Sequence, residues 1–516
     1  MKFLKKTFAY ILPAMMVLGG ATACTDFIEI DPENKVPEQG VDFTNKNNMY
    51  QPVVGAYSKV RTQGMHWCNA LLMFTRDGDV WSGRTDDQGD AVAFGRKFNY
   101  NNSFWALNQV WMNFYDIIRI TNAALQSLDG YAEYLAAGSE DYKTYESYCG
   151  EVRTIRAWAY YCLVTNFGPT VIYRDNLQTD FRRSTVEAVY NYMLEDLNYA
   201  IDKLPRMRPN QMEHKGAVTA FTAQALAARI YLLKGDYAQV ETLTDDIIKN
   251  GGFRLYDDFY QLFKIPGKLC DESLFECQVT DYGNGSGDYL GVDQWFNFQG
   301  PNMAERYDEV VNADGTISYK QAEGTKSIGG WNFIGYEPEF VAWAEARGEG
   351  VRAETSFLKA LSKTREGWQV GPTSATKTDC WNGKGYLPYN QMTLPRTTYG
   401  ANNNVRIIRY AEVLLMSSEA KVRLGKDGDA GYNEVRRRAG MSTKTGVTLK
   451  DVMDERRMEL CGEWCARYVD LVRTGDAATV LGPKGWTAEK TYWPIPANQL
   501  DDLPDLKLEP IDGIAE

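Results

Sequence analysis

The sequence predicts a mainly α-helical protein in which degenerate tetratricopeptide-type helical pairs form a scaffold, with long irregular loop segments and minor β structure. Three observations support this fold class. Several long segments repeat apolar residues at three- and four-residue steps, as the buried side of a helix does. Two regions read as a helix, a tight glycine turn and a second helix, which is the unit of tetratricopeptide repeats. Hydrophobic residues make up 44% of the chain, enough to fill a large core.

The chain begins with the pattern of a secretory signal over residues 1–23. Three lysines precede an apolar run at residues 8–18, and small residues lead from there to Cys24. This spacing leaves two cleavage sites open. Ala21 and Ala23 suit the ordinary signal peptidase, whereas Cys24 suits a lipoprotein cysteine whose thiol receives a diacylglyceryl group. No later stretch is long and apolar enough to predict a membrane-spanning helix.

Residues 24–48 are polar and predict a tether, which is lipidated if Cys24 is the cleavage site. We expect an N-terminal region at residues 49–270 and a C-terminal region at residues 271–516. The expected helices, in chain order, are 111–128, 151–164, 185–204, 219–233 paired with 237–249, and 406–424 paired with 430–438.

Two stretches, residues 64–105 and 281–336, mix glycine, aspartate, asparagine and aromatic residues with little periodicity. Irregular segments of this length inside a compact protein are usually functional. They are therefore the places where we expect a site.

The composition excludes several kinds of function. A net charge of −12 argues against nucleic-acid binding, which depends on Lys and Arg meeting phosphates. Only two histidines are present, His66 and His214, so a three-histidine zinc site is not expected. The cysteines show no CxxC spacing, and buried free thiols are the better interpretation. We expect no cofactor. Asp77-Gly78-Asp79 matches the start of a calcium loop, but Gln88 stands where the loop needs Glu; a structural calcium ion held by other oxygens stays open.

The chain also resembles the SusD/RagB family of surface lipoproteins. The resemblance rests on eight short motifs in the family's order, each weak alone. They are Cys24 with Thr25-Asp26, WMNFYDIIRITN from Trp111, Glu151 with Arg156-Ala157 and Phe167-Gly168, LLKGDY from Leu232, RYAEVLLMSSEA from Arg409, NEVRRRAG from Asn433, ERRMELCGEWCARYVDLVRTG from Glu455, and Pro494-Ile495-Pro496.

This resemblance implies a location, a partner and a function. It favours lipidation of Cys24 and placement at the cell surface on the outer membrane. It also implies that the protein captures an oligosaccharide and delivers it to a SusC-like TonB-dependent transporter, without acting as an enzyme. The charged residues of the later motifs, such as Glu455, Glu459 and Arg456, are expected to tie helices together.

A glycan site needs flat rings for the apolar faces of sugars, with polar groups beside them for the hydroxyls. The family's sites are built from rings in the two irregular stretches, which implies the same here. The candidate ligand-binding residues are Trp67, Trp81, Arg84, Asp86 and Tyr100 in the first stretch, and Tyr289, Trp295 and Trp331 in the second. Trp105 and Trp111 are instead expected to hold helices together.

Two alternatives remain open. An acidic, aromatic-rich helical protein of this size also suits an α-helical-toroid glycoside hydrolase or lyase, in which two carboxylates do acid and base work. The same fold and partner could also serve a peptide or another nutrient.

Overall fold

The computed structural model describes residues 40–82, 89–279, 293–372, 378–392, 402–464 and 466–515. Two units are distinguished, Met1–Asn48 and Met49–Glu516. The described part of the first includes the 3-10 turn Lys46–Asn48. The second unit, Met49–Glu516, holds the other helices and strands of the described residues. The boundary expected at residue 270, between an N-terminal and a C-terminal region, stays a prediction.

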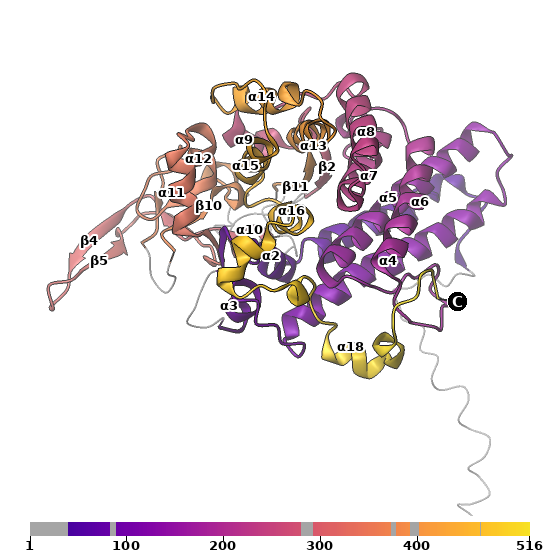
Figure 1. Ribbon diagram of the computed structural model, residues 1–516, viewed down its shortest axis with the longest axis horizontal. Coiled ribbons are helices and arrows are strands. Elements are labelled where there is room, and N and C mark those ends of the chain that lie inside the picture. Colours follow the sequence, from indigo (N-terminus) through magenta and orange to yellow (C-terminus); the bar gives the residue numbers. More distant parts are fainter. Residues whose placement is uncertain are drawn as a thin grey trace, which may run out of the picture. The chain divides into compact units, whose positions relative to one another are not determined.

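The first half of the second unit is an array of helices. Its members are α1 (Gln51–Lys59), continued by a π-helical turn (Val60–Gly64), α2 (Trp67–Phe74), α3 (Gly89–Arg96), α4 (Trp105–Ala132), α5 (Glu140–Phe167), α6 (Val186–Lys203), α7 (Ala220–Lys234) and α8 (Tyr237–Asn250). From α4 to α8, consecutive helices pack side by side (Figure 1). The five helices expected in this half are confirmed, although α4 and α5 begin earlier than predicted.

Local sequence sets where these helices end. Thr219 caps α7, and Gly235 ends it in the left-handed conformation with φ of 72°. Asp236 then caps α8 by accepting a hydrogen bond from the Gln239 amide at 3.1 Å. A glycine is favoured at such a helix end because other residues pay a steric penalty there. The expected helix–turn–helix pair is therefore confirmed in detail.

The second half of this unit is made of shorter elements. Its helices are α9 (Phe259–Leu262), α10 (Asp293–Gln299), α11 (Pro338–Ala346), α12 (Val351–Ser356), α13 (Tyr410–Arg423), α14 (Asp429–Arg438), α15 (Leu449–Glu459), α16 (Ala466–Thr474), α17 (Ala477–Leu481) and α18 (Ala497–Asp502). Helix α13 packs against α8 of the first half and against α14 and α15 of its own. The mainly helical fold class is confirmed.

Small antiparallel sheets complete the unit. The strands are β1 (Val80–Ser82), β2 (Ser273–Cys277), β3 (Met303–Ala304), β4 (Tyr307–Val311), β5 (Ile317–Gln321), β6 (Ser327–Ile328), β7 (Ile334–Tyr336), β8 (Phe357–Lys359), β9 (Gln369–Val370), β10 (Cys380–Asn382) and β11 (Val405–Arg409). They form sheets in the orders β1-β7-β10-β8, β11-β2, β6-β3-β9 and β4-β5. The pairing of β1 with β7 joins the two stretches that the sequence marked as irregular.

Two predictions about regularity were wrong. The helix expected from residue 406 begins at Tyr410, because residues 405–409 pair with β2 as a strand. The stretches 64–105 and 281–336 also contain more structure than expected, including α2, α3 and β3 to β7. Their short elements gave no sequence period because most of them are buried on several sides.

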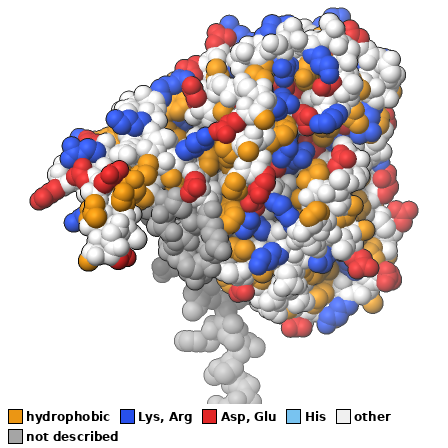
Figure 2. Space-filling view, turned by 60° about the vertical axis from the view of Figure 1, so that its left-hand side comes forward, with side chains coloured by type: hydrophobic (Ala, Val, Ile, Leu, Met, Phe, Trp, Pro, Cys, Tyr) orange, Lys and Arg blue, Asp and Glu red, His pale blue; other side chains and the backbone are white. Residues whose placement is uncertain are grey.

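The hairpin of β4 and β5 projects from the body of the unit (Figure 1). Val311 and Ile317 lie opposite each other near its tip and are 73% and 57% exposed. On the face seen in Figure 2, charged side chains of both signs are interspersed, with hydrophobic side chains between them.

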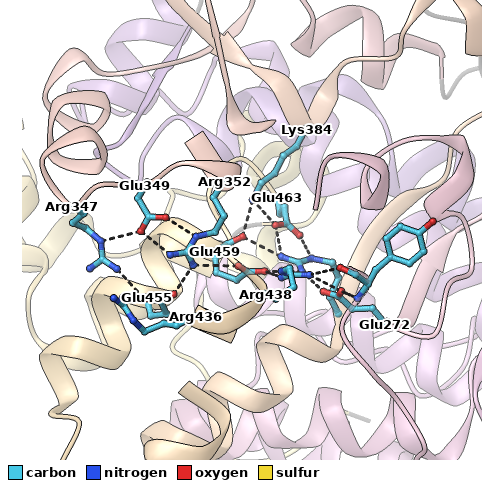
Figure 3. Close-up of polar contacts among 12 residues, drawn as sticks. Glu272, Arg347, Glu349, Arg352, Lys384, Arg436, Arg438, Glu455, Glu459 and Glu463 are labelled. Carbon is cyan, nitrogen blue, oxygen red and sulfur yellow. Dashed lines mark hydrogen bonds and ion pairs between the residues drawn. The ribbon is translucent and has the colours of Figure 1, made fainter. Parts of the chain in front are cut away.

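A buried ion-pair network lies between the elements of the second half (Figure 3). Its cations and anions alternate, and its members are Arg347, Arg352, Lys384, Arg409, Arg436, Arg438, Glu272, Glu349, Glu455, Glu459 and Glu463. The Arg352 side chain is fully buried and binds Glu349 at 2.7 Å and Glu455 at 2.6 Å. Burial raises the pKa of Glu459, but the arginines around it outweigh burial and bring its pKa to about 2.

A second group of ion pairs joins the last helices. Arg456 of α15 binds Asp470 of α16 at 2.9 Å, and Arg473 binds both Asp470 and Glu419 of α13. The prediction that the charged residues of the later motifs tie helices together is confirmed.

Helix α1 meets α5 through a buried carboxyl group. The hydroxyls of Tyr57 and Tyr50 donate to Glu151 at 2.8 and 3.2 Å. Burial raises the pKa of Glu151 to about 7, and the two hydroxyl groups offset only part of that rise. Glu151 has no cation beside it among the ion pairs of the described residues.

The described cysteines carry free thiols, as expected: Cys68, Cys149, Cys162, Cys277, Cys380 and Cys461 are buried, and Cys270 is half-buried. In the described part of the chain, no helix is long and apolar enough to span a bilayer.

Candidate functional site

Three tryptophans that are distant in the sequence meet at one surface. Trp67 is the first residue of α2, Trp105 is the first residue of α4, and Trp331 lies between β6 and β7. The ring centroid of Trp67 is 5.7 Å from that of Trp105 and 6.1 Å from that of Trp331. Trp105 is 55% exposed, and the other two rings are partly exposed. We call these three residues the aromatic platform.

Two buried phenylalanines lie beneath the platform. Phe298 and Phe333 stack on each other at 4.9 Å, and the ring of Trp67 contacts both, at 5.4 and 6.5 Å. Because their neighbours are packed, the exposed rings can hold one orientation at low entropic cost. The packed neighbours thus hold the platform rings in place.

Backbone bonds fix the position of Trp331. Its amide donates to the Asn297 carbonyl at 2.6 Å, and the Asn332 amide donates to the Gly300 carbonyl at 3.0 Å. The Asn332 side-chain oxygen accepts from the Asn302 amide at 3.1 Å. Asn332 has φ of 60°, a conformation that asparagine tolerates better than most residues. The turn therefore depends on asparagine at this position.

His66 also packs against Trp67. Its ring stacks on Trp67 at 5.9 Å, and its Nδ1 accepts from the Cys68 amide at 3.2 Å, which caps α2. Burial lowers the pKa of His66, so the ring is neutral at pH 7. A neutral imidazole in this position is a structural element and carries no charge to the platform.

Two other predicted ligand residues, Trp81 and Trp295, are buried, and a third, Tyr100, is half-buried. Trp81 is buried in β1, with the Arg96 guanidinium over its ring at 3.6 Å. Trp295 is buried in α10 and stacks on Trp464 at 5.2 Å. The Tyr100 hydroxyl donates to the Lys490 carbonyl at 3.1 Å, within a different aromatic cluster. The structure does not bring these rings to the platform. Arg84, Asp86, Tyr289 and Cys24 lie outside the described residues.

Trp105 is the platform residue that the sequence analysis assigned to helix packing. Its neighbour Trp111 is buried as expected, but Trp105 lies on the outer side of α4. The helix period contains the signal: Ala106, Leu107 and Val110 define the buried side, and Trp105 falls outside it.

Metal binding has little support in the described part of the chain. Among those residues, no group of three or more His, Cys, Asp or Glu side chains could hold a metal ion. A structural calcium ion stays an untested expectation.

Comparison with known proteins identifies the family. A family model for the SusD family matches residues 292–485, and one described as starch-binding, associating with outer membrane, matches residues 26–232. The chain belongs to the SusD family. One of the two models is described as that of a starch-binding protein, which agrees with the prediction that this chain is not an enzyme.

Individual relatives are distant in sequence and similar in fold. A SusD-like protein of Bacteroides ovatus is 25% identical over 402 residues, which are 71% of this chain and 65% of that protein. The match thus covers less than two thirds of that relative's length. A structure titled laminarin binding SusD-like protein has a TM-score of 0.72 at 23% identity, covering 90% of this chain and 98% of that one. Surface glycan-binding protein A from Bacteroides thetaiotaomicron, in complex with laminarihexaose, has a TM-score of 0.70 at 22% identity, with 88% and 97% covered. These two structures support the fold.

Proposed function

We propose that this SusD-family member is a cell-surface protein that captures an oligosaccharide on the aromatic platform. The observation that carries the proposal is the meeting of Trp67, Trp105 and Trp331 at one partly exposed surface, above a packed floor. Flat rings of this kind provide a large apolar area for the faces of pyranose rings. Binding of this kind needs no covalent step, so the platform requires neither a nucleophile nor a general base.

The angles between the rings suggest the shape of the ligand. The planes of Trp67 and Trp105 are inclined by 61°, and those of Trp67 and Trp331 by 84°. Coplanar rings would suit a straight, flat glycan. Strongly inclined rings suit a chain that turns, such as a β-1,3-glucan, because successive sugars present their faces in different directions. A relative bound to laminarihexaose supports this class of ligand.

Delivery and anchoring complete the proposal. The lipoprotein pattern at Cys24 would attach the chain to the outer membrane through the tether, and a SusC-like TonB-dependent transporter would receive the glycan. The family description, which refers to association with the outer membrane, supports this location. Replacing Cys24→Ala should abolish labelling by a radioactive fatty acid and release the protein from the membrane fraction. Persistent labelling would contradict the anchor.

The binding proposal is tested by calorimetric titration with laminarihexaose and with cellohexaose, a straight glucan of equal length. We expect the native protein to prefer laminarihexaose, and Trp67→Ala and Trp331→Ala each to weaken that binding about tenfold or more. Trp368→Ala is the matched control, since that partly exposed ring stacks on Tyr389 outside the platform.

Three outcomes would contradict the proposal. Equal affinity of the control and platform variants would remove the platform from the site. Binding of peptides without glycans would favour another nutrient, and turnover of the bound glycan would favour an enzyme.

A further inference from the structure

A pocket that is separate from the platform lies between α4, the segment 173–181 and α18. Its volume is about 300 Å³, at the lower end of the range for small-ligand pockets. Four aromatic rings form a continuous wall. Trp111 and Tyr115 are 4.8 Å apart, Tyr115 and Tyr173 are 5.2 Å apart, and Tyr173 and Phe181 are 5.8 Å apart. Tyr173 and Phe181 are partly exposed, and the buried Trp111 and Tyr115 lie behind them, so the pocket combines a small volume with an aromatic wall.

The amide side chains of this pocket have a fixed orientation. Asn176 uses its NH₂ group to donate to the Arg119 carbonyl at 2.9 Å, and Gln178 donates to the Asp180 carbonyl at 2.6 Å. Backbone carbonyls can only accept, so each amide must turn its nitrogen toward the protein. Gln499 similarly donates to the Asn108 side chain at 2.9 Å and to the Met112 sulfur at 3.4 Å.

These bonds leave hydrogen-bond acceptors at the pocket. Within the part of the chain that the structure describes, the side-chain oxygens of Asn176, Gln178 and Gln499 accept no hydrogen bond. Asp175 uses one carboxylate oxygen for the Leu177 amide and adds another acceptor. Arg119, paired with Asp116 and 53% exposed, supplies donors at the rim. An acceptor-rich pocket with one cation and one anion at its edge suits a neutral ligand with many hydroxyl groups.

Helix α4 relates this pocket to the platform. Trp105, Met112 and Arg119 are spaced by seven residues, so they lie along one side of the helix. At 1.5 Å per residue, the pocket residues Met112 to Arg119 lie roughly 10–20 Å from Trp105 along the axis. Between them, the Gln499 side chain of α18 donates a hydrogen bond to the Asn108 side chain of α4. The two surfaces are therefore neighbours on one helix but are separate sites.

We propose that this pocket is a second carbohydrate site, which binds one or two units of a neutral sugar independently of the platform. The partly exposed rings of the wall, Tyr173 and Phe181, contact the apolar face of the sugar. The amide oxygens accept from its hydroxyls, and Arg119 donates to a ring or hydroxyl oxygen. This inference goes beyond the proposed function, because it holds whether or not the platform binds glycan.

The test uses the full mature chain carrying Trp67→Ala and Trp331→Ala, so that platform binding does not interfere. Saturation-transfer NMR is recorded with glucose, galactose, mannose, xylose and laminaribiose as probes. We expect transfer to at least one of them, and about tenfold weaker binding after Arg119→Ala or Gln178→Ala. Leu177→Ala is the matched control, because that side chain is 83% exposed and does not line the pocket.

The variants alter an exposed and a partly exposed side chain, so circular dichroism should show native folding for all of them. A protein with intact folding that transfers no saturation to any of the five sugars would overturn the proposal. Transfer that survives the combined Arg119→Ala and Gln178→Ala changes would also overturn it, as would preferential binding of glycine or acetate over the sugars.

Discussion

The buried ion-pair network consists of charged residues, and the aromatic platform consists of tryptophans. Both residue classes are often taken as signs of a functional site, but the two regions differ in their exposure to solvent. In the network, Arg352 and Glu459 are charged but buried, and each is surrounded by opposite charges. In the platform, Trp105 is apolar but 55% exposed, with no partner ring covering its outer side among the described contacts.

The difference shows that burial separates structural from functional roles better than residue type does. Charged groups removed from water require partners to be stable, so a buried cluster of them is explained by its own pairing. In the platform, the solvent-exposed faces of the rings add nothing to the stability of the fold. Such a surface needs a different explanation, and a ligand provides one.

The largest effect should come from breaking the network. Arg352→Met removes the fully buried cation that Glu349, Glu455 and Glu459 share. Arg347 and Arg436 remain beside Glu349 and Glu455 but are less buried, so we expect a loss of about 3–5 kcal/mol in the free energy of unfolding. Urea denaturation measures this loss. Arg254→Ala, which removes an arginine that is 79% exposed and paired with Asp271, should cost under about 1 kcal/mol. Equal losses would mean that the network does not stabilise the fold.

Two tryptophans sharpen the comparison within one residue type. Trp295→Ala removes a buried ring that stacks on Trp464, so it should cost about 3–5 kcal/mol of stability. Trp105→Ala should leave the melting temperature nearly unchanged while weakening glycan binding by about 1–2 kcal/mol. Thermal unfolding and titration of both variants measure the two effects. A stable Trp295→Ala protein that fails to bind glycan would instead make Trp295 part of the site.

Two buried glutamates should respond to pH in opposite directions. Glu459 has its pKa lowered to about 2, so its stabilising effect is present above pH 4.5 and is lost as the pH falls toward 2. Glu151 has its pKa raised to about 7, so the folded chain holds that proton more tightly than the unfolded chain does. Below pH 4.5 this carboxyl group is protonated in both the folded and the unfolded chain, so it does not make stability depend on pH. As the pH rises from 4.5 to about 7, the free energy of unfolding falls by roughly 3 kcal/mol in total.

Glu151→Gln should remove this second dependence. Compared with the native protein, the variant should gain stability between pH 5 and pH 8, measured by urea denaturation at both values. Glu133→Gln, a change at an exposed position, serves as the control. If the gap between native and variant is the same at both pH values, Glu151 does not titrate in this range.

The smallest effect concerns the turn that holds Trp331. Both Asn332→Gly and Asn332→Val lose the hydrogen bond from the Asn302 amide, but glycine keeps the positive φ whereas valine is strained there. The valine variant should therefore bind glycan more weakly than the glycine variant, by about 1 kcal/mol. Titration of the two variants distinguishes them. Equal binding would show that Trp331 finds its position without this turn.

Most of the helical scaffold follows from sequence because its signal is local. Helix α4 repeats apolar residues at helical period, and Gly235 marks the turn after the alanine-rich α7. The sequence places the start of α13 too early, at residue 406. The residues before Tyr410 form the strand β11 instead, because they pair with the distant β2. Pairing of this kind leaves no trace in a short window of sequence.

The candidate site could be located only in part. The irregular stretches directed attention to Trp67 and Trp331, and the pairing of β1 with β7 brings those stretches together. Trp295 has a similar sequence context, but its ring is covered by Trp464, which lies in the connection between α15 and α16. Contacts between remote segments decide which rings are covered, and a single sequence does not contain them.

The distribution of the free thiols has a practical consequence. Because burial raises the pKa of the described cysteines and hides all but Cys270, a thiol reagent should react slowly with the folded chain and quickly with an opened one. Cys68 in α2 lies beside the platform, Cys162 lies in the helical array, and Cys461 follows the ion-pair network at the end of α15. The protein therefore carries natural reporters of local unfolding in three regions. Mass spectrometry of a timed labelling reaction could rank how often each region opens, with no engineered probe.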